Sequence, residues 1–347
     1  MINNQNFETF KKEIDAYIEE ESVSLAKGDY NAIYTVEQGS DRANPTEKTY
    51  SGPGLMRRVG LTGNAITDNP LDGYKTVYQL GVYRKEVQFD STAMETDQSD
   101  EIEKMARGLP RTIEYSRSAH TFSLIRRMED PTMVGGDGKQ LLSVAHPRKD
   151  GNGTQSNTFV DGVQRELTYD NAVILRNVLR SQVSNTGNLL GAGDPRRKMC
   201  LWVSRDLEER AFQIAGTGMR PGGNNNLVKK PDTANNDRNY FVEGVNFDVL
   251  VLDFVSHEIA TQAGETSVAK SSSLNNYDTR WGICDPAIMK EFFKVKFLIG
   301  YDSGLITEDV NHRNQVVSKF ANDKYSFGYT SWLGFTGSLG DDSTLAI

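Results

Sequence analysis

Residues 97–130 read DQSDEIEKMARGLPRTIEYSRSAHTFSLIRRMED and carry the strongest helical pattern of this 347-residue sequence. The apolar residues recur at intervals of three and four, which places them on one face of a helix: Ile102, Met105, Leu109, Ile113, Phe122 and Ile125. Asp97 or Ser99 can cap its start. A helix running unbroken from residue 98 to residue 128 would be about 45 Å long. Gly108 and Pro110 predict a kink or a split, because proline removes a backbone donor and clashes one turn back.

The sequence before this helix is extended and rich in glycine. From Tyr50 to Asp90 it is punctuated by Gly, Pro and Asn, and residues 76–89 alternate like a strand. A strand of that length would reach about 45 Å, which is long for a compact domain. We therefore expect a long two-stranded loop that projects from a body.

The first 50 residues are polar, with one short amphipathic segment. Thr9 is a candidate N-cap, and Phe10, Ile14, Tyr17 and Ile18 then fall on one stripe. We expect a small helix on an N-terminal arm, with an apolar stripe that needs a partner.

After the long helix the pattern becomes a mixture of strands and helices. We expect a turn at 135–138, a strand in LLSVAHP (141–147), a polar hairpin near 152–162, and a long surface loop at 216–238. Expected buried strands are 198–203, the segment within 239–255, KVKFLIGY at 294–301, and a last aromatic strand beginning at Lys324. Expected helices are capped by Thr168, Ser204 and Asp285.

Composition narrows the range of functions. The net charge of −8 and a pI near 5.2 argue against binding to a nucleic-acid backbone. Cys200 and Cys284 have no metal-like spacing and predict reduced thiols in a bacterial-type cytoplasm. The longest apolar stretch, within 245–255, is too short to span a bilayer, and the start has no apolar leader, so we expect no membrane association and no signal peptide.

His146 is the first residue to test for catalysis, because the chain has only four histidines. Its functional interpretation is a base or a metal ligand. The structural interpretation, which we favour, is a histidine fixed by Pro147 at a strand end and bonded to the backbone. The four histidines show no metal-ligand spacing, and Ser143 and Ser256 do not lie on a nucleophile elbow.

Three further sequence patterns favour a structural role over a catalytic or ligand-binding role. RKDGNGT at 148–154 resembles only the start of a calcium loop, and GAGDPR at 191–196 departs from the dinucleotide fingerprint, so both predict turns. The C-terminal aromatics suit a strand with a buried face better than a stacking platform: Tyr325, Phe327, Tyr329, Trp332 and Phe335. The charged residues of the extended loop are either solvated or contacts to a neighbouring subunit: Arg57, Arg58, Lys75 and Arg84.

An arm, a projecting hairpin, a long helix and a loop-rich α/β body suit a subunit that touches many copies of itself. With these parts in this order, the sequence resembles the major capsid proteins of tailed bacteriophages, which have the HK97-like fold. Within that family, the resemblance is nearest to the Mu-type head subunits. The residues behind the resemblance are LLSVAHP after Gly-Gly-Asp-Gly, CLWVSRDLEERAFQIAG at 200–216 and FGYTSWLGFTGS at 327–338.

The resemblance implies an α+β fold of four parts. These are an N-terminal arm (1–49), an extended E-loop (50–92), a P-domain with the spine helix (93–166 and 311–347) and an axial A-domain (167–310). It implies a structural protein without enzyme activity or cofactor, which forms hexamers and pentamers in an icosahedral shell around phage double-stranded DNA. The shell would be the virion capsid, assembled in the host cytoplasm.

The same resemblance raises the question of partners. A separate scaffolding protein, a portal and a decoration protein are expected candidates, and no membrane is involved. Some relatives carry a scaffolding segment before the arm, for which there is no room if Met1 is the true start. Some relatives also cross-link Lys to Asn; Lys75, Lys85, Asn311, Asn314 and Asn322 lie in the corresponding parts, but we predict no cross-link.

Two alternatives stay open. An encapsulin-type nanocompartment uses the same fold around cargo enzymes, and a gene beside its cargo would indicate one. A hydrolase using His146 or His257 would lose an activity when either histidine is replaced.

Overall fold

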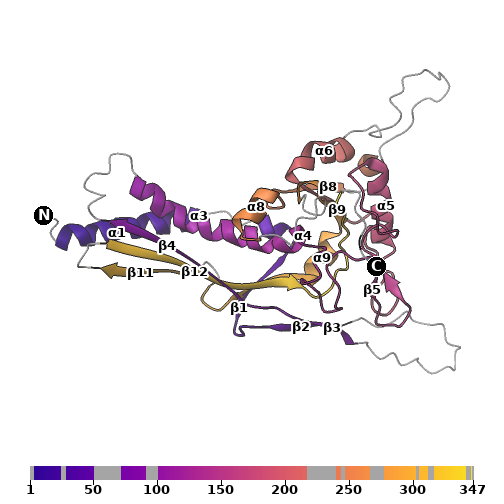
Figure 1. Ribbon diagram of the computed structural model, residues 1–347, viewed down its shortest axis with the longest axis horizontal. Coiled ribbons are helices and arrows are strands. Elements are labelled where there is room, and N and C mark those ends of the chain that lie inside the picture. Colours follow the sequence, from indigo (N-terminus) through magenta and orange to yellow (C-terminus); the bar gives the residue numbers. More distant parts are fainter. Residues whose placement is uncertain are drawn as a thin grey trace, which may run out of the picture.

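The structure is a computed structural model of the chain (Figure 1). It describes residues 4–24, 29–50, 72–90, 101–216, 240–243, 247–265, 277–301, 305–311, 316–340 and 345. In Figure 1 a long tongue of helices over a sheet extends from a body that carries α5, α6 and a second sheet, and a hairpin, β2–β3, lies below the base of the tongue. The shape is elongated, as the sequence predicts.

Two long helices pack together along the tongue. α1 (Asn4–Ser24) and α3 (Glu101–Thr121) bury their apolar stripes against each other and against the sheet below. This tongue core consists of buried residues from both helices and two strands: Phe10, Ile14, Ile18, Phe89, Ala106, Leu109, Ile113, Val317 and Ala321. The predicted arm helix is confirmed and α3 is its partner, although the helix begins at Asn4, before the predicted cap at Thr9.

Pro110 does not split the long helix. α3 continues through it, and the break falls at Phe122, after which α4 (Ser123–Arg126) forms a separate turn. An interior proline costs about 3 kcal/mol in a helix. Leu109 and Ile113 on either side of it are buried in the tongue core, and the burial of such side chains, about 1.5–3 kcal/mol each, offsets that local cost.

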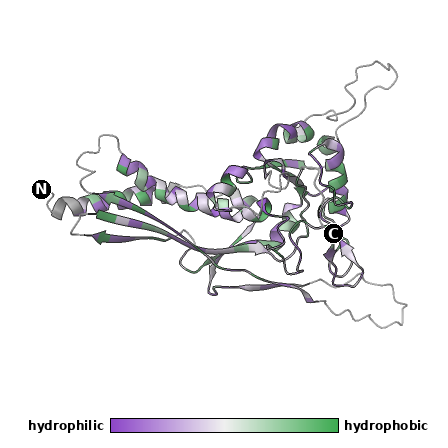
Figure 2. Ribbon diagram, in the orientation of Figure 1, coloured by the Kyte–Doolittle hydropathy of each residue, from purple (hydrophilic) through white to green (hydrophobic). Residues whose placement is uncertain are grey.

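The tongue sheet is built around β12 (Val316–Tyr329). β4 (Gly81–Asp90) pairs along one edge of β12, and β11 (Leu305–Asn311) and β10 (Phe293–Leu298) follow one another along the other edge, all antiparallel. β1 (Thr35–Ser40) pairs in parallel with β10. Burial alternates along β12, so one face of the sheet is covered; Figure 2 shows the matching mixture of hydrophilic and hydrophobic residues along the tongue.

The predicted strand 76–89 is two strands. β3 (Asp72–Val77) pairs with β2 (Thr46–Tyr50) in a hairpin, whereas β4 joins the tongue sheet. Between them Tyr78 is buried and donates its amide to the carbonyl of Pro45, and Leu80 donates to the side chain of Asn44. Apolar and polar residues alternate in both strands, so the pattern continues across the break. Periodicity alone therefore could not locate the turn.

The body surrounds a three-stranded sheet. β7 (Met199–Ser204) is entirely buried between β8 (Phe247–Leu252), which is parallel to it, and β9 (Trp281–Cys284), which is antiparallel. Helices surround this sheet: α5 (Tyr169–Arg180), α6 (Glu208–Gly216), α7 (Tyr240–Glu243), α8 (His257–Gln262) and α9 (Pro286–Phe292). Short 3₁₀ turns are η1 (Asp29–Ala32), η2 (Arg205–Leu207) and η3 (Tyr277–Thr279).

Of the three caps predicted in the body, two are confirmed, and the predicted cap of the long helix, Asp97 or Ser99, lies outside the described residues. Thr168 accepts from the amide of Asn171, and Asp285 accepts from Ala287 and Ile288 with Pro286 in the first turn. The prediction for Ser204 is wrong, because its hydroxyl donates to the carbonyl of Asp278 and η2 precedes the helix.

LLSVAHP is a strand only at its end. β5 (His146–Pro147) pairs with β6 (Thr154–Gln155) around the predicted polar turn, but residues 141–145 are irregular. The side chain of Asn157 accepts from the amide of Ser143 at 2.9 Å and donates to the carbonyl of Leu141 at 2.6 Å. One buried amide thus replaces the strand partner that these backbone groups would otherwise need.

Candidate functional site

The base of the hairpin is tied to the tongue sheet by a cluster of four charges. Lys294 contacts Glu37 at 2.6 Å and Glu47 at 2.9 Å, and Lys296 contacts the same two acids. Lys296 is nearly buried. Burial raises the pKa of Glu37, but hydrogen bonds from Lys294 and Lys296 outweigh it, so the pKa lies below its usual value. Since Glu47 belongs to β2 and the lysines to β10, the cluster fixes the hairpin on the sheet.

The other side of the hairpin rests on the segment 135–149. The Tyr74 hydroxyl donates to the carbonyl of Pro147 at 3.0 Å, and the Lys149 ammonium lies 4.4 Å from the centre of the Tyr74 ring. Gly136 passes so close that a Cβ there would lie 2.7 Å from the Thr76 hydroxyl. The Gly-Gly turn is therefore needed for the close approach of β3, a role that the sequence did not reveal.

His146 lies beneath this contact and is fully buried. Its Nδ1 is 2.6 Å from an Asp137 carboxylate oxygen, and its ring stacks on Trp332 with 4.4 Å between centroids. Its Nε2 has no hydrogen-bond partner among the described residues. His146 lies at a strand end beside Pro147, as expected, but the expected bond to the backbone is wrong, because the partner of its ring is the Asp137 carboxylate.

This geometry gives no support to the catalytic interpretation. A Ser-His mechanism needs a hydroxyl bonded to the histidine nitrogen that is not held by the acid, and no described side chain bonds to Nε2 of His146. Ser143 instead accepts from the amide of Ala145, and Ser256 caps α8. His257 is exposed at the start of α8, near the Tyr277 ring.

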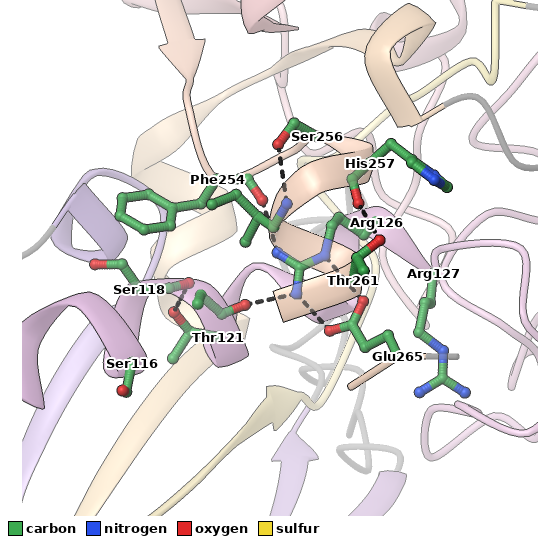
Figure 3. A network of polar contacts seen from close by, with 12 residues as sticks. Ser116, Ser118, Thr121, Arg126, Arg127, Phe254, Ser256, His257, Thr261 and Glu265 are labelled. Atoms are coloured by element: carbon green, nitrogen blue, oxygen red, sulfur yellow. Dashed lines mark hydrogen bonds and ion pairs between the residues drawn. The ribbon is translucent and has the colours of Figure 1, made fainter. Parts of the chain in front are cut away.

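A second joint connects the end of the long helix to the body (Figure 3). Arg126 is fully buried, yet each side of its guanidinium is bonded. It donates to Glu265, to the Phe254 carbonyl at 2.6 Å and to the Ala119 carbonyl at 2.6 Å. Arg280 pairs with Glu129 beside it and donates to the Ile125 carbonyl. These buried pairs hold the two flanks of the segment 266–276 on α4.

The residues predicted to contact other subunits are only partly described. Lys75 is exposed on β3, opposite Lys48, and Arg84 is exposed on β4, opposite Asn322. The structure brings neither to the joints above. Arg57 and Arg58 lie outside the described residues, as do His312, Asn314 and the predicted loop after Gly216 up to Arg238.

The remaining patterns are structural, as predicted. Asp150 bonds to Arg148 and to Asn152 within the β5–β6 turn. Gly191 and Gly193 both have positive φ in the GAGDPR turn. Most of the C-terminal aromatics are buried in the core of the body and the tongue base: Tyr325, Tyr329, Trp332 and Phe335; Phe327 is packed against it.

Within the described ranges, no set of three or more His, Cys, Asp and Glu side chains is arranged to hold a metal ion. Over the same ranges, no helix has the length and apolar character that crossing a membrane requires.

Comparison with known proteins adds information on the fold. No family model and no curated protein matches the sequence. Among solved structures, the capsid of a native GTA particle matches with a TM-score of 0.50 at 10% identity, over 90% of this chain and 91% of that chain. A Microbacterium phage Oxtober96 structure matches with a TM-score of 0.48 at 8% identity, over 91% of both chains. A Mycobacterium phage Ogopogo structure matches with 0.46 at 13%, over 90% and 92%.

At such low identity the likeness concerns the fold. The match to the native GTA capsid extends over nine tenths of both chains. The chain therefore has the α+β, HK97-like capsid fold.

Proposed function

We propose that this chain is the major capsid protein of a tailed bacteriophage, which assembles as hexamers and pentamers into an icosahedral shell around double-stranded DNA. The neighbour whose fold it shares is itself a capsid protein of a native particle. The acidic composition suits a wall that must not bind the packaged phosphate backbone tightly.

One observation carries this proposal. The tongue extends well beyond the body (Figure 1), and large apolar side chains along the tongue and on the hairpin are exposed: Val23, Val77, Val82 and Met105. Apolar side chains exposed along one part of a chain mark surfaces that contact other chains. A tongue with a helical face and an open sheet face, joined to a separate body, is a shape that suits contact with several neighbours at once.

Four parts are proposed with the boundaries that the sequence suggests: arm 1–49, E-loop 50–92, P-domain 93–166 with 311–347, and A-domain 167–310. The β2–β3 hairpin would form the base of the E-loop, and its two anchors would set the direction in which the loop leaves. Arg57, Arg58, Lys75 and Arg84 are proposed as contacts to neighbouring copies, of which Lys75 and Arg84 are exposed. A structural role without enzyme activity follows from the proposal.

The proposed partners are other copies of this chain, with a separate scaffolding protein, a portal and a decoration protein as further candidates. The proposed location is the virion, after assembly in the host cytoplasm. Genes for a portal, a protease and a terminase next to this one would support the phage capsid; a neighbouring cargo enzyme would indicate an encapsulin instead.

Electron microscopy and sedimentation velocity of the full chain test the proposal. We expect rings or closed shells, formed alone or with a co-expressed scaffold. Replacing Arg57, Arg58 and Arg84 by Glu should reduce the assembled fraction at least tenfold, while Arg196→Glu, an exposed site on the body, should not. A folded chain that stays monomeric at high concentration in all these conditions would refute it.

A further inference from the structure

The only two cysteines of the sequence lie side by side in the body. Cys200 on β7 and Cys284 on β9 are directly opposed in the antiparallel register. Directly opposed residues point to the same face of a sheet, with Cα atoms about 4.5–5.5 Å apart. That interval lies inside the range of about 4.4–6.8 Å that a disulfide spans, so the register brings the two cysteines within reach of a disulfide.

The immediate surroundings fit a reactive pair with two different roles. The two thiols are hydrogen-bonded to each other, which lowers the pKa of Cys200 and raises that of Cys284, where burial adds to the increase. Cys200 is 8% exposed, and Cys284 is 2% exposed. Both thiols are therefore buried, and Cys200 is the less enclosed of the two and the easier to ionise.

We propose that Cys200 and Cys284 are a redox site, which a small disulfide oxidant such as glutathione disulfide converts into a cross-strand disulfide between β7 and β9. The inference rests on the strand register and does not depend on the proposed capsid function. It extends the expectation of reduced thiols in the cytoplasm: the two cysteines are reduced there and become joined after release into an oxidising medium.

The chemistry balances without a further reactant. Cys200 loses its proton, and its sulfur attacks one sulfur of the oxidant, whose S–S bond breaks and releases a first glutathione thiolate. Cys284 then loses its proton and attacks the Cys200 sulfur, which breaks the mixed disulfide and releases a second thiolate. The two thiolates take up the two protons, so two protein thiols are oxidised and one disulfide is reduced to two thiols.

The bond would strengthen the body. It would close a loop from residue 200 to residue 284 that contains β8, α6 and α8, and cross-linking a long loop stabilises a fold mainly by restricting the unfolded chain. Cys284 also directly precedes Asp285, the cap of α9, and its backbone bridges to Phe335. We expect the oxidised chain to unfold at a clearly higher denaturant concentration, and dithiothreitol to reverse the shift.

The test uses the folded, full-length chain incubated with glutathione disulfide, quenched with acid and measured by intact mass spectrometry and by thiol titration in denaturant. We expect a loss of two hydrogen atoms, a fall from two titratable thiols to none, and a monomer on a non-reducing gel. Dimers linked by disulfide, a wild-type chain that retains glutathione, or two thiols that persist while the denatured chain is oxidised would each overturn the proposal.

Single variants test the two roles. Cys284→Ser should accumulate a chain carrying one glutathione on Cys200, whereas Cys200→Ser should remain unmodified over the same time, after circular dichroism has shown that both are folded. The opposite pattern would overturn the assignment of Cys200 as the attacking sulfur. If neither variant folds, the wild-type mass and thiol count still decide whether the disulfide forms.

Discussion

At the scale of single residues, the joints of this molecule depend on buried arginines that are each paired with an acid. Arg126, Arg280 and Arg117 are each almost inaccessible, and each pairs with an acid and also donates to a main-chain carbonyl. Burying a charge is costly unless it is paired and its remaining donors are satisfied. These arginines therefore fix how the elements meet, and the loss of one leaves an unpaired acid behind.

Arg126→Ala should destabilise the fold by about 3–5 kcal/mol, because Glu265 would stay buried without its partner. The Phe254 and Ala119 carbonyls would lose their donor as well. Denaturant unfolding followed by circular dichroism measures the change, and Arg196→Ala, an exposed residue paired with Asp194, should unfold like the wild type. Arg126→Met combined with Glu265→Met should recover much of the loss; an Arg126→Ala variant as stable as the control would contradict the role of the joint.

His146→Ala should destabilise the chain by about 2–4 kcal/mol, through a cavity against Trp332 and an Asp137 carboxylate without its bond. His146→Asn, which keeps a donor near Asp137, should lose less. His257→Ala, at an exposed site, is the matched control and should be close to neutral. A chain that kept its stability while losing a hydrolytic activity would instead support the enzyme interpretation.

Sequence patterns predict residues whose partners are near in the chain. Thr168 and Asp285 were identified as caps because a cap bonds to amides two or three residues later. Glu265 bonds to Arg126 across 139 positions, and no local pattern signals that distance. Asp137 was missed for a different reason: it lies nine residues before His146 in a glycine turn, where an acid usually serves the turn itself.

At the scale of elements, tertiary packing determines where helices and strands break and pair, which local propensity does not specify. The amphipathic pattern correctly predicts α1 and α3, and the need of α1 for a partner is met by α3 itself. Two expected outcomes are wrong: the long helix is not split at Pro110, which stays inside α3, and the strand 76–89 is interrupted at Tyr78. In both cases the burial of neighbouring apolar side chains determines where the element breaks. The sequence pattern alone does not show which side chains will be buried.

Ile14→Asp should detach α1 from the tongue, because Ile14 is fully buried between α1 and α3. A buried, unpaired carboxylate is costly enough to expel the helix. Limited proteolysis should then cut within the first 24 residues at least tenfold faster than in the wild type. Val23→Asp, on the same helix but 84% exposed, should be cut at the wild-type rate; equal rates for the two variants would show that the tongue core does not hold α1.

Acid should loosen the hairpin base. The pKa of Glu37 is lowered in the folded chain by its hydrogen bonds from Lys294 and Lys296, which exceed the opposing effect of burial. Its contribution to stability is therefore present above the unfolded pKa, near 4.3, and is lost as the pH falls through the lower folded value.

Denaturation midpoints measured from neutral pH to about pH 3 for the wild type and Glu37→Gln check this sign. The wild type should be more stable at neutral pH, and the difference should shrink as the pH falls. Glu86→Gln, on the exposed face of β4, should show no such converging difference. A gap that widens in acid would contradict the stated role of Glu37.

At the scale of the whole molecule, the described residues form two separate apolar cores. A large core joins the body to the base of the tongue, and a small one holds α1, α3 and the outer part of the tongue sheet together. The division into cores was not predicted, since it depends on β4 and β12 extending beyond the body (Figure 1). The small core holds the long tongue together with few residues. We therefore expect its free energy of unfolding to be lower than that of the large core.

Native-state hydrogen exchange should therefore show two levels of protection. Amides of α1, of β4 and of β11 should open together with a free energy below that of global unfolding, whereas amides of β7 and β9, buried on all sides in the large core, should exchange only through global unfolding. Ile14→Asp should lower the first level and leave the second unchanged, while Arg126→Ala, at the joint with the body, should lower the second. A single common level for tongue and body in the unassembled chain would show that the two cores unfold as one. In assembled particles the tongue level should rise most, because neighbouring copies would then cover the surface that the small core leaves open.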